Sequence, residues 1–330
     1  MPEPAREPLQ ADLPETGGGR AQGRPWAPAG HFYSPLVDPN DEYVGRALDL
    51  EARPPEIGAA LGLDEAEILR WLSIMAESYD PLPFRGSPER NSLYHYRNAA
   101  FPLADALALL AVMKEKRPRR YIEAGCGFSS CAAIEINERF LGGGAEMTFL
   151  DPHPETLLEL LPADSPHRRC VRRMKLQEAP IGMFAGLRAG DILFIDSSHV
   201  AKTGSDVLDY LFRVFPALEP GVAIHVHDVF FPFEYPAAWV RDENRSWNEA
   251  YFLRAFLHDN PRYRVFFFSD WVYKRRRKIL EERMPLWIEG RGGCRRVRPR
   301  FRLDPAARIG HPGNRQGQRE KAPIAQQRPP

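Results

Sequence analysis

Acidic and imidazole side chains follow two apolar runs of this sequence. The run DILFID ends at Asp196, with His199 three residues later, and the run VAIHVHD ends at His227 and Asp228. Such runs are typical of buried parallel strands, and the carboxyl ends of adjacent parallel strands meet at one edge of the sheet. We therefore expect Asp196, His227 and Asp228 to converge. Two carboxylates and an imidazole suit a hard divalent cation, Mg²⁺ or Mn²⁺.

His199 is the candidate general base of the same edge. Imidazole has an ordinary pKa near 6.5, which suits it to accept a proton from a hydroxyl at neutral pH. The structural alternative is that Asp196 caps a turn, His227 packs in the core and His199 is a surface residue. His225 lies one pleat earlier and is expected to pack within its strand.

A glycine turn follows an earlier apolar run, in the segment RYIEAGCGFSS (residues 120–130). An acid at the end of a strand, Gly125 and Gly127 two apart, and small residues opening a helix are typical of a nucleotide-like binding turn. A dinucleotide fingerprint would place a third glycine at position 130, where this chain has Ser130. That difference argues against an NAD-linked oxidoreductase, which remains one alternative.

Two further acids are candidates for cofactor contacts. Asp151 ends the next apolar run, MTFLD, where nucleoside-binding sheets place a carboxylate that accepts both ribose hydroxyls. The alternative for Asp151 is a helix N-cap, since PHPE follows it. Glu178 lies in the loop after the third predicted strand, and either reaches the adenine edge or is solvated.

Strands and helices alternate from residue 120 onward. Strands are predicted at 121–124, 147–151, 169–172, 191–196, 222–228 and 263–268, with a seventh at 286–288. Helices are predicted at 64–75, 103–113, 129–140, 156–161, 206–218 and 249–258. This alternation predicts an α/β fold, a Rossmann-like, doubly wound and mostly parallel seven-stranded sheet with helices on both faces.

Composition divides the chain into four regions. Residues 1–30 are rich in Pro, Gly and Ala and are expected to be disordered, and residues 31–100 are expected to form an N-terminal helical cap. Residues 101–290 form the predicted catalytic domain. Residues 291–330 lose all periodicity and are expected to be a disordered basic tail.

Charge and hydropathy restrict the partners and the compartment. Residues 271–330 hold 17 Lys and Arg against 5 Asp and Glu, a net charge of +12, which leaves −11 for the rest of the chain. The tail arginines come with almost no aromatic residues, so nucleic acid is not the expected partner. No run is long enough to span a membrane, the start of the chain lacks the order of a secretion signal, and the four cysteines show no metal-type pairing. A cytoplasmic protein with a small-molecule substrate is expected.

Five blocks in order carry a family resemblance: EAGCGFSS, FLDPHP, GDILFIDSSHV, LEPGVAIHVHDVFFPFEYP and WNEAYFLRAFL. Together they resemble a bacterial group of class I S-adenosylmethionine-dependent methyltransferases, over roughly residues 31–290. The chain is similar, more distantly, to metal-dependent O-methyltransferases that act on sugars and catechols.

The resemblance implies roles for individual residues. S-adenosylmethionine would be the cofactor, with Glu123 at its amino-acid end and the turn through Ser129 beneath it. In the sugar enzymes an Asp-x-x-His supplies a metal ligand and a catalytic base, which match Asp196 and His199. His227 stands where those enzymes carry a carboxylate, so a site without metal that uses His199 alone stays open.

The sequence therefore predicts methyl transfer to a hydroxyl of a small polar metabolite, for which a sugar is one candidate. Another alternative is a S-adenosylmethionine-binding module that has lost turnover. The aromatic segment at residues 230–236 would form a wall for the substrate, a buried loop, or a contact in a homo-oligomer.

Overall fold

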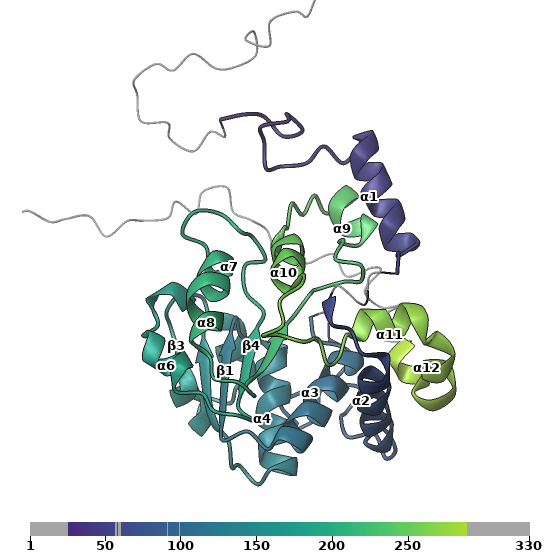
Figure 1. Ribbon diagram of the computed structural model, residues 1–330. Helices are drawn as coiled ribbons and strands as arrows, with labels where there is room; N and C mark the ends of the chain where they lie inside the picture. Colours follow the sequence, from purple (N-terminus) through teal and green to yellow (C-terminus); the bar gives the residue numbers. More distant parts are fainter. Residues whose placement is uncertain (1–25, 57, 59–60, 91, 99, 289–330) are drawn as a thin grey trace, which may run out of the picture. The chain divides into compact units, whose positions relative to one another are not determined.

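Five parallel strands form the central sheet of the computed structural model (Figure 1). They are β1 (Arg120–Ala124), β2 (Glu146–Leu150), β3 (Val171–Arg172), β4 (Ile192–Ile195) and β5 (Ala223–Val226), in the order β3-β2-β1-β4-β5. The structure describes residues 26–56, 58, 61–90, 92–98 and 100–288. The regions predicted to be disordered, at residues 1–30 and 291–330, lie wholly or mostly outside these ranges.

Strand order reverses between β1 and β4. Tyr121 pairs with Met147 of β2 on one side and with Ile192 of β4 on the other, although β4 lies about 70 residues further along the chain. At such a reversal the loops that leave neighbouring strands turn to opposite faces and leave room for a ligand at the carboxyl edge. The loops after β1 and β4 therefore meet where the sequence places its candidate residues.

Helices cover both faces of this sheet (Figure 1). The helices α3 (Leu103–Lys116), α4 (Phe128–Phe140) and α5 (Glu155–Leu160) pack against one another in one layer. The helices α6 (Ile181–Ala185), α7 (Asp206–Asp209) and α8 (Phe215–Ala217) form the second. α3 is buried around most of its circumference, as its apolar sequence LADALALLAVM predicts. The doubly wound α/β prediction is confirmed.

Two helices precede this domain, α1 (Glu42–Ala52) and α2 (Glu65–Glu77). The Asp64 side chain accepts hydrogen bonds from the first turn of α2, as predicted, and α2 packs on α3 through buried residues such as Trp71 and Met75. Helices are thus present in residues 31–100, but α2 joins a helical layer of the domain. An N-terminal cap over the ligand edge stays a prediction.

The predicted sixth and seventh strands were wrong for the part of the chain that the structure describes. Residues 263–268 pair with no strand. Phe266 instead packs on Trp71 and Tyr263 on Phe256, with ring centroids 5.1 and 4.8 Å apart. Residues 285–288 are helical. The aromatic residues of the segment 263–268 are partly covered, but the side chains that cover Tyr263 and Phe266 come from helices. The C-terminal helices are α9 (Ala237–Arg241), α10 (Glu249–Leu257), α11 (Ser269–Arg275) and α12 (Arg277–Arg283).

The helix predicted at residues 206–218 is interrupted. Between α7 and α8 the backbone forms a π-helical turn at Tyr210–Val214. Pro216 follows and lacks the N–H that a regular helix would use there. None of the described helices combines the length and apolarity that a bilayer crossing requires.

Candidate active site

Gly125 joins the end of β1 to the end of β4. Its φ is +81°, and a Cβ added there would lie 1.7 Å from the carbonyl oxygen of Asp196. No side chain fits at that distance, so the requirement for glycine comes from the protein itself. Gly125 thus allows the predicted cofactor loop to lie directly against Asp196, the first residue of the predicted metal site.

Gly127 is a glycine for another reason. Its φ of 179° is extended, and an added Cβ would meet only Thr156 Cγ2, at an ordinary distance of 3.6 Å. Neither backbone strain nor a protein neighbour explains the missing side chain. The glycine leaves room for a ligand to approach the backbone at the start of α4, and its role in cofactor binding stays a prediction.

Glu123 is buried at the end of β1 and accepts three hydrogen bonds. Tyr121 donates to Oε2 at 2.8 Å, and the hydroxyls of Ser129 and Ser130 donate to Oε1 at 2.6 and 2.8 Å. Burial raises the pKa of Glu123 to about 7, although the three hydroxyls work to lower it. In this structure Oε1 holds the first turn of α4 and Oε2 binds Tyr121 of β1, and direct contact with a cofactor stays a prediction.

Asp151 and Glu178 also bind backbone. Asp151 Oδ2 accepts from the N–H of Cys126, between the two glycines, at 3.0 Å, and Oδ1 accepts from His153 at 2.7 Å. α5 begins after Pro154 without a side-chain cap, so the N-cap alternative for Asp151 was wrong. Glu178 is exposed and accepts from the N–H of Lys175. The ribose and adenine roles of the two acids stay predictions.

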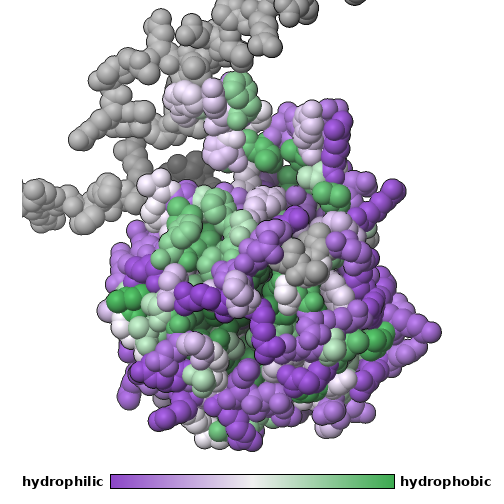
Figure 2. Space-filling model, in the orientation of Figure 1, coloured by the Kyte–Doolittle hydropathy of each residue, from purple (hydrophilic) through white to green (hydrophobic). Residues whose placement is uncertain are grey.

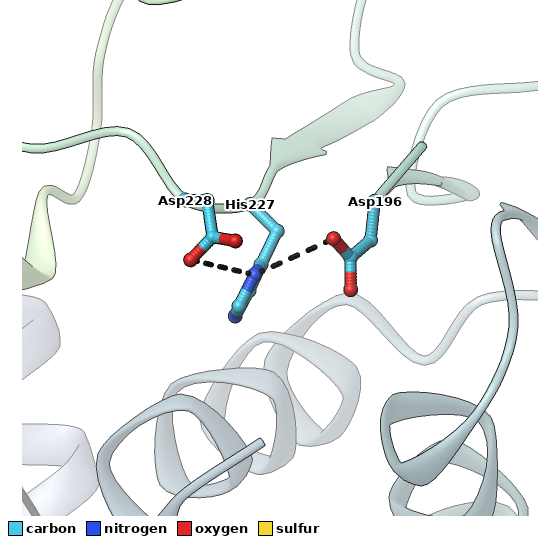
Figure 3. Close-up of side chains that lie close together, drawn as sticks. All are labelled: Asp196, His227 and Asp228. Atoms are coloured by element: carbon cyan, nitrogen blue, oxygen red, sulfur yellow. Dashed lines mark ion pairs between the residues drawn. The ribbon is translucent and has the colours of Figure 1, made fainter. Parts of the chain in front are cut away.

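Asp196, His227 and Asp228 lie together at the carboxyl edge, as the sequence predicts (Figure 3). His227 Nδ1 lies 3.6 Å from Asp196 Oδ1 and 3.4 Å from Asp228 Oδ1. One ligand atom of each residue lies within 4.8 Å of the others. Burial works to raise the pKa of Asp196, but the neighbouring His227 and His199 lower it to about 2. Asp196 is therefore anionic at neutral pH.

His227 fits a cation-binding role. Its Nδ1 is buried between the two carboxylates, and no hydrogen bond reaches that atom from the described residues. Its Nε2 lies 3.5 Å from Asp105 Oδ2, on the first turn of α3. Burial lowers the pKa of His227, but the charges of Asp196 and Asp228 outweigh it and raise the pKa well above the ordinary value. The position between the carboxylates thus accommodates a positive charge, carried by a proton or by a metal ion.

His199 joins this cluster from the β4 loop. Its Nε2 lies 3.4 Å from Asp196 Oδ1 and 3.7 Å from Asp228 Oδ2, and the side chain is buried, so the surface alternative was wrong. Burial lowers the pKa of His199, but contacts with Asp196 and Glu249 outweigh it and raise the pKa to about 10. With these charges unscreened His199 holds its proton at neutral pH and cannot act as a base.

Sequence reasoning missed Glu249. Glu249 is buried and accepts from His199 Nδ1 at 2.7 Å. Asn248 makes no side-chain cap for α10; its Oδ1 accepts from the N–H of Ala201 at 2.6 Å. The sequence signal for Glu249 was its place in the block WNE (residues 247–249). Only the fold shows that its carboxylate lies beside His199.

The aromatic segment at residues 230–236 is largely buried. Phe231, Phe233 and Tyr235 are each at most 3% exposed, so the buried-loop alternative holds for these three. Phe230 is half-buried and packs on Trp239, with ring centroids 5.0 Å apart, and the substrate-wall alternative stays a prediction. His225 stacks on Phe194 with centroids 4.0 Å apart, as expected of a packed strand histidine.

Residues 122–229 match a family model described as a methyltransferase domain. The match begins in β1 and ends one residue after Asp228, so it contains the glycine turn and the whole acidic cluster. This stretch of the chain is thus similar to a methyltransferase domain, and its parallel strands lie in the order β3-β2-β1-β4-β5. The family resemblance of the sequence motifs is confirmed at this level.

Two further proteins are similar to the chain. An uncharacterized protein of Archaeoglobus fulgidus is 35% identical over 135 residues, which are 40% of this chain and 60% of that protein. The SAH-bound methyltransferase PaMTH1 of Podospora anserina is 19% identical, with a TM-score of 0.31, over 67% of this chain and 88% of that one. A TM-score at that level does not establish a common fold.

Proposed function

We propose that the protein transfers the methyl group of S-adenosylmethionine to a hydroxyl of a small polar molecule, with sugars as the first class to test. The observation that carries the proposal is the contact of Gly125 with the Asp196 carbonyl. It fixes the loop expected to bind the cofactor beside a cluster of acids and imidazoles. A methyl donor at the loop and an acceptor hydroxyl at the cluster would then be neighbours.

Positioning supplies most of the catalysis in this proposal. The sulfonium methyl is already activated, so the protein has to align an oxygen with it and dispose of the oxygen's proton. Asp196, His227 and Asp228 would hold Mg²⁺ or Mn²⁺, and such an ion supplies polarisation of the acceptor hydroxyl. The two carboxylates are a suitable donor set together with His227 Nδ1, which no hydrogen bond reaches among the described residues.

His199 would accept the proton of the acceptor. The pKa of about 10 in this structure depends on nearby negative charge, including Asp196 and Asp228. Neutralising those two carboxylates lowers the pKa of His199 toward the range in which imidazole is an effective base. His199 can therefore act as the base only if a cation neutralises Asp196 and Asp228, so the two roles form one hypothesis. His199 then acts through Nε2, the nitrogen that faces them.

Calorimetric titration tests the cofactor part. S-adenosylhomocysteine should bind with micromolar affinity and NAD⁺ should not bind. Binding of NAD⁺ alone would favour the oxidoreductase alternative and refute the proposal.

Radiometric methyl transfer tests the reaction. The purified protein is given labelled S-adenosylmethionine with a panel of monosaccharides and catechol, in chelator or with Mn²⁺. Transfer to a hydroxyl that requires the metal supports the proposal. Tight binding of S-adenosylhomocysteine without transfer to any acceptor would favour the binding-module alternative.

A further inference from the structure

We infer that Glu249 is a positioning residue for His199, and that Tyr210 holds Glu249 in place for this task. The inference rests on the proposed function, since it concerns the imidazole that would accept the proton. Neither Glu249 nor Tyr210 belongs to the cofactor loop or to the acidic cluster. They lie in α10 and in the π-helical turn after α7, which the fold brings together behind His199.

The side-chain contacts form a short chain. His199 Nδ1 lies 2.7 Å from Glu249 Oε2, and the Tyr210 hydroxyl donates to Glu249 Oε1 at 2.6 Å. Glu249 is 1% exposed and Tyr210 fully buried. Because each carboxylate oxygen has its own buried partner, the carboxylate cannot rotate without breaking a hydrogen bond between buried groups.

The contact defines which nitrogen of His199 is available. A carboxylate oxygen accepts a hydrogen bond, so Nδ1 of His199 is the donor and carries the hydrogen. The other nitrogen, Nε2, then faces Asp196 and Asp228 at 3.4 and 3.7 Å. A hydrogen bond from one ring nitrogen to a buried carboxylate is the usual means by which proteins fix the tautomer of a working imidazole.

The backbone of His199 is held by the same segment. His199 has a φ of +58°, a left-handed conformation that is costly for a residue with a side chain. Its carbonyl oxygen accepts from the N–H groups of Asn248 and Glu249, each at 3.2 Å. These are otherwise unsatisfied groups at the start of α10, so the His199 carbonyl serves as the cap of that helix.

Trp247 completes the support. Its ring lies over the imidazole of His199, with centroids 4.2 Å apart and an interplanar angle of 31°. Asn248 binds both backbone groups of Ala201, accepting from its N–H and donating to its carbonyl. All three residues of the block WNE therefore act on residues 199–201. A helix start that served only as structure would not need a buried acid on the imidazole.

The π-helical turn explains how Tyr210 reaches this position. The turn begins at Tyr210, and in a π-helical turn the backbone hydrogen bonds span five residues instead of four. The change alters the direction of the side chains relative to a continuous helix. It coincides with the residue whose hydroxyl binds Glu249, which is why we include Tyr210 in the inference.

Nuclear magnetic resonance of the histidine ring nitrogens tests the inference without a substrate. His199 signals are assigned by comparison with His199→Asn, and spectra are recorded at one neutral pH. The intact protein should show a slowly exchanging, hydrogen-bonded proton on Nδ1 of His199. Glu249→Ala should lose that signal, and Glu249→Gln, which keeps an acceptor oxygen, should retain it at a shifted frequency.

A matched control separates positioning from the loss of any buried acid. Glu135 is a buried carboxylate on α4 that binds Ser92 and Tyr94, away from His199. Glu135→Gln should leave the Nδ1 signal unchanged. Absence of a hydrogen-bonded Nδ1 proton in the intact protein, or its survival in folded Glu249→Ala, would overturn the inference. If Glu249→Ala does not fold, an unshifted signal in Glu249→Gln would overturn it.

Kinetics on an acceptor found in the methyl-transfer panel provide the second test. Glu249→Ala should lower kcat by about 10- to 100-fold, as for other residues that orient a working histidine. Glu249→Gln should recover part of that loss, and KM and S-adenosylhomocysteine affinity should change by less than about twofold. An unchanged kcat in Glu249→Ala would overturn the inference. If no acceptor is methylated the proposed function fails, but the resonance test still decides the role of Glu249.

Discussion

Replacing Glu123 with Gln should make the stability of the protein less dependent on pH. Glu123 is fully buried, and burial raises its pKa from 4.5 to about 7 in the folded protein. A carboxyl group whose pKa is raised by folding contributes its full stability below its unfolded pKa. That contribution is lost as the pH rises through the folded value. Gln has nearly the same shape and has no charge to bury.

The size of the effect follows from the two pKa values. A difference of about 2.5 units corresponds to about 3.4 kcal/mol between low and high pH, at 1.36 kcal/mol per unit. About 2.5 kcal/mol of this falls between pH 5 and pH 8. Hydrogen bonds to Ser129 and Ser130 are present at both pH values, so their contribution largely cancels when the two pH values are compared.

Urea unfolding of the parent and Glu123→Gln at pH 5 and pH 8 gives the difference. The parent should lose about 2.5 kcal/mol more than the variant over this interval. Equal losses would refute a raised pKa for Glu123. S-adenosylhomocysteine titration adds a functional result: affinity within about threefold of the parent supports an indirect role, whereas a loss of about tenfold or more would show direct contact with the cofactor.

Three further outcomes are expected. Gly127→Val should fold but lose S-adenosylhomocysteine binding in calorimetry, and retained binding would refute the cofactor turn. Gly125→Ala should destabilise the fold by about 4 kcal/mol or more, because the added Cβ would collide with the Asp196 carbonyl. Asp228→Ala should abolish Mn²⁺ binding and most methyl transfer while S-adenosylhomocysteine affinity stays unchanged, and full activity in a strong chelator would refute the metal. Asp105→Asn should weaken Mn²⁺ binding by about 10- to 100-fold, because His227 loses the carboxylate on Nε2; unchanged Mn²⁺ affinity would show that Asp105 does not orient His227.

The sequence was sufficient for the repeated strand-helix units and for the edge on which the site lies. Apolar runs such as DILFID have few alternatives in water, because a run that is apolar at every position must be buried on both sides. Parallel pairing then places every strand end at the same edge. Asp196 and Asp228 therefore converge whatever the details of packing, and so the candidate cluster could be named from residue order alone.

The apolar sequence patterns predicted the wrong element where a segment packs against the domain without pairing in the sheet. Residues 263–268 (YRVFFF) have the apolar and aromatic composition of a strand, yet half-buried Phe266 packs on Trp71 of α2 and no strand of the described residues lies beside it. The helix predicted at residues 206–218 has the correct period, but a π-helical turn interrupts it at Tyr210, whose hydroxyl binds Glu249. Apolar spacing reports how much surface must leave water and does not identify the group that covers it.

The sequence by itself determined the α/β fold, the glycine turn and the identities of Asp196, His199, His227 and Asp228. Only the tertiary structure decided which atoms face one another: Gly125 against the Asp196 carbonyl, Asp105 behind His227, and Glu249 with Tyr210 behind His199. These contacts join residues from 39 to about 120 positions apart, as for Glu249 with Tyr210 or Asp105 with His227. Short-range spacing carries no information about such pairs, because their distance is determined by how helices pack on the two faces of the sheet.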